Sequence, residues 1–198
     1  MEIDPTGYWS WGGFLAGVAT VVVGIAAVAV TVATGGAAAP LAAAAISAVG
    51  TLASTAIITT GATVAYAAAT DSTAVVEIGY NISHSRAGLS LVMDFNGGED
   101  DTCELYKRTG STTSSGVGVA YSVGLVEDYY KQGDYAGPFV SVSCSAKGYG
   151  IDYCQSPLEK PGKGARATTA SFSMGIGTSE SASISFAYDQ YTSIAFWQ

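Results

Sequence analysis

The longest feature of the hydropathy pattern is the run of residues 5–70, which contains no charged side chain. Within it, residues 14–32 also lack Asn, Gln and Pro. As a helix with a rise of ~1.5 Å per residue they would extend about 28 Å, close to the thickness of a bilayer core. Residues 41–64 have the length of a second span, and the Gly- and Pro-containing segment 34–40 between the two favours a turn. The pattern therefore predicts an apolar helical hairpin over 14–70.

We expect this hairpin to insert into a membrane. At roughly −0.3 to −0.6 kcal/mol for each large apolar residue, the first segment reaches about −3 to −6 kcal/mol and the second about −2 to −4 kcal/mol. A secretory signal peptide is disfavoured, because the acidic start lacks a positive n-region. The alternative is a hairpin buried beneath the remaining ~130 residues, which could cover only part of it. The candidate membrane-inserting residues are Phe14, Leu15, Val21, Val22, Val23, Ile25, Val28, Ile46, Ile57 and Ile58.

The second segment carries a stripe of hydroxyl side chains. They recur at every fourth position, which places them along one slowly drifting line of a helix. A polar line on an apolar helix could face a water-filled path or another helix in lipid. Alternatively, each hydroxyl bonds the carbonyl four residues before it and has no further role. The candidate pore-lining residues are Ser47, Thr51, Thr55, Thr59 and Thr63.

After residue 71 the pattern changes to short alternating runs rich in Tyr, Ser and Gly. Such runs predict strands over 74–80, 88–95, 117–126, 139–145, 148–154, 167–175, 182–188 and 193–197. About eight short strands suggest an antiparallel β barrel or sandwich. A bacterial outer-membrane barrel is an alternative, although several runs are shorter than the ~10 residues that such strands need. The predicted class is α+β, with a boundary segment at 1–13, the hairpin at 14–70 and the β domain at 71–198.

Composition narrows the function classes. The chain has 198 residues and a formal net charge of −8, and all eight Lys and Arg residues lie at or after Arg86. A nucleic-acid binder is excluded, because phosphate recognition needs clustered basic side chains. Hydrophobic residues make up 48% of the chain, which excludes general disorder.

The three cysteines leave two interpretations open. Cys144 and Cys154 are symmetric about Tyr149, so a hairpin centred there would bring both to one face, where a disulfide could form. Otherwise they are small buried hydrophobic residues. Cys103 is left over in either case, and the chain has no zinc-binding pattern. We therefore predict no metal and no cofactor.

The sequence contains none of the common catalytic motifs, so no catalytic residue is assigned. His84 could act as a base but is typical of a solvated loop. The acidic segment 94–101 could bind calcium, although it lies between strands and fits a solvated turn. Glu127 and Asp128 offer paired carboxylates without known neighbours. The basic residues Lys160, Lys163 and Arg166 could contact anionic lipid heads or form an exposed loop.

The start of the chain carries a family resemblance. The motif Asp4-Pro5-Thr6-Gly7 resembles the Asp-Pro-x-Gly motif that closes the conserved core of Rhs-repeat proteins, although Tyr8 stands where the family commonly has Leu. The resemblance covers residues 4–13 by motif and the rest by composition. It implies that Asp4, Pro5 and Gly7 mark the core boundary. It also implies a C-terminal toxin enclosed by an Rhs shell, commonly delivered by type VI secretion and neutralised by a cognate immunity protein.

Together these observations predict a secreted antibacterial effector. Its hairpin would enter the target-cell membrane and permeabilise it, as a homo-oligomer. Two alternatives remain at this stage: an enzymatic β domain that the hairpin translocates into the cytosol, and a non-toxic structural tail that seals the Rhs shell.

Overall fold

In the computed structural model, the described residues are 59–96, 102–127, 133–156, 165–176 and 182–197. The chain divides into two units, Met1–Gly61 and Ala62–Gln198, and nearly all described residues belong to the second. The described residues form a helix over 59–69, which begins in the first unit and continues into the second, and eight strands in the second unit. The strands are β1 (Thr73–Ile82), β2 (Ser85–Asp94), β3 (Thr102–Thr112), β4 (Val117–Glu127), β5 (Gly137–Ala146), β6 (Tyr149–Gln155), β7 (Arg166–Ile176) and β8 (Ser183–Trp197).

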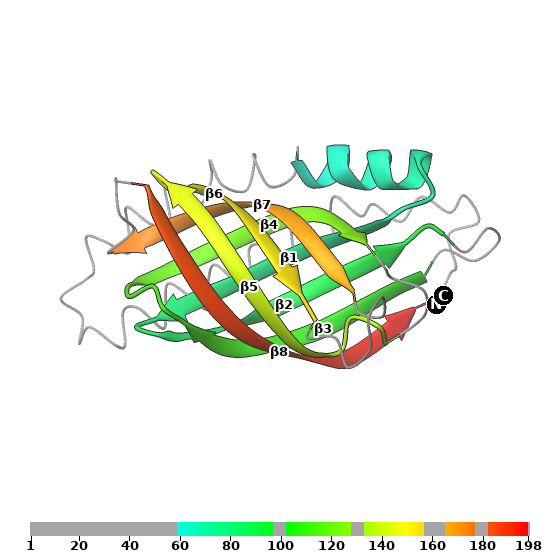
Figure 1. The fold of residues 1–198 in the computed structure, drawn as a ribbon. Helices are drawn as coiled ribbons and strands as arrows, with labels where there is room; N and C mark the ends of the chain where they lie inside the picture. Colours follow the sequence, from blue (N-terminus) through cyan, green and yellow to red (C-terminus); the bar gives the residue numbers. More distant parts are fainter. Residues whose placement is uncertain (1–58, 97–101, 128–132, 157–164, 177–181, 198) are drawn as a thin grey trace, which may run out of the picture. The chain divides into compact units, whose positions relative to one another are not determined.

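The strands close into a single antiparallel barrel with the order β1-β2-β3-β8-β5-β6-β7-β4 (Figure 1). The first four strands have the spatial order 4-1-2-3, and the last four have the equivalent order 8-5-6-7. Each of these is a Greek key, in which the fourth strand returns to pair with the first. The barrel therefore consists of two consecutive Greek keys, joined where β3 pairs with β8 and where β4 pairs with β7.

Two tight hairpins occupy equivalent places in the two Greek keys. The β1–β2 hairpin turns at Ser83 and His84, and Ser83 has a φ of 56°. The β5–β6 hairpin turns at Lys147 and Gly148, with φ values of 52° and 83°. In the β5–β6 hairpin, positive φ at both central residues matches the turn type whose twist suits a two-residue hairpin.

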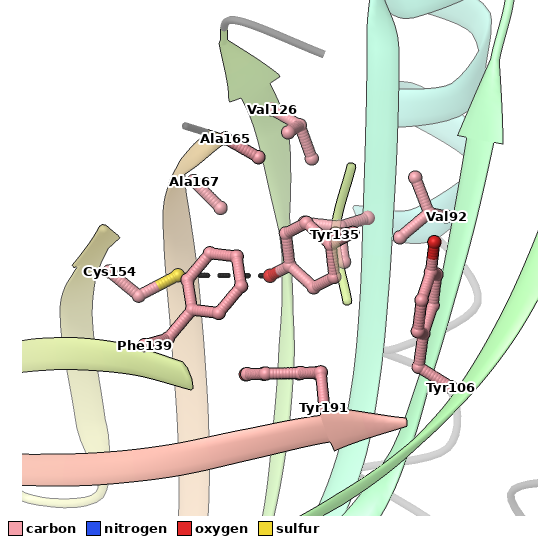
Figure 2. Close-up of a cluster of buried hydrophobic side chains, with 10 residues drawn as sticks. Val92, Tyr106, Val126, Tyr135, Phe139, Cys154, Ala165, Ala167 and Tyr191 are labelled. Atoms are coloured by element: carbon pink, nitrogen blue, oxygen red, sulfur yellow. Dashed lines mark hydrogen bonds between the residues drawn. The ribbon is translucent and has the colours of Figure 1, made fainter. Parts of the chain in front are cut away.

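The core lies inside the barrel. Near the end where β1 begins and β8 ends, side chains from all eight strands and from the β4–β5 connection fill the interior (Figure 2). The ring centroids of Tyr135 lie 4.8 Å from Phe139 and 4.9 Å from Tyr191. An eight-stranded barrel has an interior just wide enough for such side chains to fill. The cluster consists of Val75, Val92, Tyr106, Val126, Tyr135, Phe139, Cys154, Ala165, Ala167 and Tyr191.

The predicted α+β class with an N-terminal helical hairpin is wrong. The part of the chain that the structure describes is a closed β barrel with one short helix. That helix begins inside the expected second helix and continues five residues beyond its expected end at 64. It ends at Thr70, whose hydroxyl donates to the carbonyl of Tyr66 at 2.9 Å. No helix among the described residues is both long and apolar enough to cross a membrane.

Two of the predicted strands also differ. The hydropathy pattern predicts no strand over 102–112, where β3 lies, because Glu104 and Arg108 interrupt the apolar alternation. It predicted two strands over 182–188 and 193–197, which form the single 15-residue strand β8. The register of β8 against β3 shifts between Leu105 and Tyr106, which leaves Ile194 as an extra residue. This bulge and the inward-facing Asp189 resemble a break between strands in the sequence.

Candidate functional site

The interior of the barrel contains a carboxylate that accepts hydrogen bonds from five side chains. Glu77 lies on the inward face of β1 and is buried. Its Oε2 accepts from Arg108 Nη1 at 2.8 Å and from Ser122 Oγ at 3.3 Å. Its Oε1 accepts from Ser90 Oγ and Tyr191 OH, both at 2.8 Å, and from Tyr135 OH at 3.4 Å. These donors come from β2, β3, β4, β8 and the β4–β5 connection, so Glu77 links five of the eight strands through side-chain hydrogen bonds.

Electrostatics favour the charged form of this carboxylate. Burial alone raises the pKa of Glu77, but Arg108 and the hydrogen bonds from Ser90 and Tyr191 outweigh burial, and the net pKa is lowered. Burial alone lowers the pKa of Arg108, but Glu77 opposes it and the net pKa is raised. Both partners therefore remain ionised in the interior.

A second ion pair lies farther along the barrel. Arg86 Nε is 3.2 Å from Asp189 Oδ1, and the Asp189 side chain is buried. Neither of these two atoms has a well-aligned hydrogen bond, so the contact is electrostatic. Burial raises the pKa of Asp189, and Arg86 and Arg108 reduce that rise only in part. Together the two ion pairs neutralise four charges within the barrel.

Gly133 and Tyr135, in the connection between β4 and β5, contact side chains inside one end of the barrel. Gly133 donates its backbone N–H to Glu104 Oε2 at 3.0 Å, and Tyr106 also donates to this carboxylate. Tyr135, two residues after Gly133, is fully buried within the aromatic cluster (Figure 2). The aromatic packing leaves this end filled with side chains. The interior groups thus hold one another in place, as expected for a structural network.

The outer surface of β5, β6 and β8 has the opposite character. We call it the β5–β6–β8 flank. Most outward-facing side chains on these adjacent strands are apolar or aromatic, and several are more than half exposed, including Ile184 at 67%, Ile151 at 62% and Phe186 at 54%. The polar Gln155, Gln190 and Thr192 lie toward the strand ends away from the β5–β6 turn. None of the outward-facing side chains described on these three strands is charged. The members of the flank are Val140, Val142, Cys144, Tyr149, Ile151, Tyr153, Ile184, Phe186 and Tyr188.

The strand register makes the flank continuous. Val142 pairs with Phe186 on one side and with Tyr153 on the other. One row farther, Cys144 pairs with Ile184 and Ile151. Side chains paired directly across neighbouring strands lie about 4.5–5.5 Å apart at Cβ, within contact distance. The exposed residues therefore form one patch rather than scattered positions, and such patches mark interaction sites.

Polar or small residues border the flank on both sides. On the outward face of β3, Lys107, Thr109 and Ser111 are exposed. On β7, Thr168 and Ala170 are exposed and small. The outward side chains of β1, β2 and β4 are also mainly apolar, but most are less exposed: Tyr80, Leu89, Val119 and Leu125 are half-buried, and Ala74, Val76, Ile78, Leu91, Met93, Tyr121 and Val123 are buried. Among the described side chains of the barrel, the large apolar ones that are exposed thus concentrate on the flank.

The structure decides between the two interpretations of Cys144 and Cys154 against a disulfide. All three are free. The β5–β6 turn is centred between Lys147 and Gly148 rather than at Tyr149, so Cys144 points outward and is exposed while Cys154 points inward and is buried. Burial raises the pKa of Cys154 and of Cys103 to about 12. Cys144 is therefore the accessible thiol of the chain.

Most residues that the sequence singled out lie outside the described residues. These are the ten candidate membrane-inserting residues, the candidate lining residues Ser47, Thr51 and Thr55, and the boundary residues Asp4, Pro5 and Gly7. Thr59 and Thr63 lie on the described helix and are half-buried, and nothing tests a pore-lining role for them. Predictions at these positions stay predictions.

The remaining candidates do not come together. His84 is exposed in the β1–β2 turn, 3.3 Å from Ser83 Oγ. Asp94 ends β2 and accepts from Thr73 at 2.7 Å, while 97–101, 128–132 and 157–164 lie outside the described residues. Glu127 and Arg166 are paired in register at the ends of β4 and β7. The described residues contain no group of side chains suited to a metal ion.

The flank and the interior network were not predicted from the sequence. The alternation of apolar and polar residues is visible in 183–188 and 149–154, but it does not state which face is the interior. No feature of the sequence indicates that the polar face of β3, with Glu104 and Arg108, faces the barrel interior. Comparisons with known protein families, with curated proteins and with solved structures give no match.

Proposed function

We propose that the protein is a membrane-binding effector whose barrel attaches to lipid through the β5–β6–β8 flank. One observation carries this proposal: a continuous, uncharged and exposed apolar surface on three adjacent strands. We assign the lipid contact to the barrel. This assignment replaces the membrane-inserting helical hairpin that the sequence suggested.

The composition of the flank supports a lipid partner. Tyr149, Tyr153 and Tyr188 combine an apolar ring with a polar tip, and such side chains are favoured at membrane–water interfaces. Fully burying a large apolar side chain contributes about 1.5–3 kcal/mol, so the exposed half of each flank residue contributes about 1 kcal/mol. Seven such residues supply roughly 5–10 kcal/mol before the cost of association.

The interior is also compatible with a lipid surface. A closed barrel satisfies its backbone N–H and C=O groups between strands, which hydrocarbon requires. The charges of Glu77 and Asp189 face basic partners inside the barrel rather than the surface. Because the aromatic cluster fills one end, we do not place an ion path through the barrel.

We keep antibacterial toxicity in the proposed function because the Rhs resemblance implies it. A shell would cover the flank until release, and the flank would then attach the effector to the target-cell membrane. Permeabilisation would follow attachment. An immunity protein that covers the flank would prevent it.

Vesicle flotation of the full chain tests the proposal. The double variant Ile184→Ser/Phe186→Ser should bind phosphatidylcholine vesicles at least about tenfold more weakly, because two side chains of about 1 kcal/mol each are removed. The matched control is Ile82→Ser, an exposed isoleucine at the end of β1 with 37% exposure; it should change binding less than about twofold. Equal binding by the double variant, with unchanged thermal unfolding, contradicts the proposal. Dye release from the same vesicles then measures permeabilisation separately.

A further inference from the structure

Resting on the proposed function, we infer that the barrel lies on its side in the membrane interface, with β5 deepest, and does not span the bilayer. Among the side chains that the structure describes, the large apolar ones that are exposed on the barrel concentrate on one side of it, whereas the apolar outward side chains of β1, β2 and β4 are mostly buried or half-buried. A spanning barrel instead needs an apolar band around its whole circumference.

The outward face of β3 argues against spanning. Lys107 is exposed near the middle of this strand, in register with Leu89 and Thr192. Thr109 and Ser111 continue the polar line toward the end of the strand. A spanning orientation would place Lys107 in hydrocarbon, where a charged side chain is strongly unfavourable near the midplane. A barrel lying on its flank keeps this line in water.

Strand length and topology lead to the same orientation. β6 has 7 residues, fewer than the roughly 9–11 that a tilted strand needs to cross a bilayer. Membrane-spanning barrels are up-and-down meanders, whereas this barrel is built from two Greek keys. Neither feature opposes an orientation in which strands lie along the interface.

The flank-on orientation assigns a depth to each row of side chains. Apolar faces that lie in the interface enter by about 5–10 Å. β5 is the middle strand of the flank, and Cys144 on it lies between Ile184 and Ile151. We therefore expect Cys144 in the acyl region and Thr109, on β3, in water.

Site-specific fluorescence separates the two orientations. One sample carries an environment-sensitive fluorophore on Cys144 of the otherwise unchanged chain. The other carries it on the variant Cys144→Ser/Thr109→Cys. Both are mixed with phosphatidylcholine vesicles that contain lipids with a nitroxide quencher on the acyl chain. We expect a blue shift and at least about twofold quenching for the label at 144, and less than about 10% quenching for the label at 109.

The remaining outcomes are decisive as well. Quenching of both labels indicates a spanning barrel and overturns the inference while leaving membrane binding intact. Unlabelled chain that fails to float with vesicles overturns the proposed function itself. If the chain floats with vesicles but neither label is quenched, the membrane contact lies elsewhere on the protein. This result overturns the inference. A blue shift at 144 that grows with protein concentration without vesicles identifies a second copy as the occupant of the flank and overturns both. The variant Cys144→Ser/Ala146→Cys repeats the first measurement if the label at 144 weakens flotation.

Discussion

The guanidinium of Arg108 lies against Gly79, in space that a side chain at position 79 would fill. A Cβ at this position would overlap Nη2 of Arg108 and approach the carbonyl oxygen of Ala87. A similar relationship holds between Gly110 and the Asp189 carboxylate. Glycine at these two positions allows charged side chains to pack against the barrel wall.

Gly79→Ala should therefore destabilise the barrel. The added methyl must displace Arg108 from Glu77 or shift the backbone, and overpacking of this kind costs about 1–3 kcal/mol. Urea denaturation measures the change in the free energy of unfolding. Gly61→Ala is the control, since a Cβ there meets nothing within 4 Å and Ala favours a helix by about 1 kcal/mol. Equal stability of Gly79→Ala and the wild type would show that Arg108 does not occupy this space.

Removing either charge of the Glu77–Arg108 pair should lower the free energy of unfolding strongly. Removing both charges should lower it by less than the sum of the two single effects. Glu77→Gln leaves Arg108 charged and unpaired in the interior, and such a change costs about 3–5 kcal/mol. Arg108→Met likewise leaves Glu77 charged and unpaired in the interior. The double variant removes both charges, so a double-mutant cycle should give a coupling of at least about 1 kcal/mol. Additive effects would contradict direct pairing.

The acid stability of the barrel should depend on Glu77. The folded pKa of Glu77 is lowered, so its contribution to stability is fully present above the unfolded pKa of about 4.3 and is lost as pH falls through the folded pKa. The free energy of unfolding should therefore decrease below about pH 4.3, and the decrease should be smaller in Glu77→Gln. Denaturant unfolding between acidic and neutral pH gives both slopes, and parallel slopes in the two proteins would exclude this role.

Asp189 should act in the opposite direction. Its folded pKa is raised, so folding disfavours its charged form, and stability decreases as pH rises from the unfolded pKa of about 3.9 toward the folded pKa. Asp189→Asn should remove this decrease. The same titration measures it, and an unchanged profile above about pH 3.9 would contradict the raised pKa.

Thiol titration should find one reactive cysteine in the native protein and three after denaturation. Cys144 is exposed, whereas burial raises the pKa of Cys103 and Cys154 to about 12, which leaves little thiolate at neutral pH. Cys144→Ser should abolish the fast phase of reaction with a chromogenic disulfide. Fast reaction of two thiols in the native state would place a second cysteine at the surface.

The sequence predicted the β domain better than it predicted the faces of the strands. Strands were expected at 74–80 and 88–95 and are found there, because apolar alternation and nearby turn residues agree at these places. β3 was missed, since Glu104 and Arg108 look like surface residues until their partners are known. Those partners come from distant strands, 31 residues away in the case of Glu77 and Arg108, so no local pattern could show them.

The flank was missed for a related physical reason. In a barrel, alternating residues of a strand face either the interior or the outside. The usual interpretation of an alternating pattern is that the polar residues face outward. Here Ser141 and Asp152 face inward, while Val142 and Tyr153 face outward. Closure of the barrel determines which residues of each strand face inward. Closure depends on the pairing of β3 with β8 and of β4 with β7.

The double Greek key also bears on how the chain assembles. Separated from the other, each half would leave two long strand edges, β3 and β4 or β7 and β8, with free backbone donors and acceptors. Those edges are complementary between the halves, so fragments cut in the connection between β4 and β5 should recombine into one barrel. For the same reason, halves from two chains could exchange, which makes reciprocal swapping the characteristic misassembly of this fold.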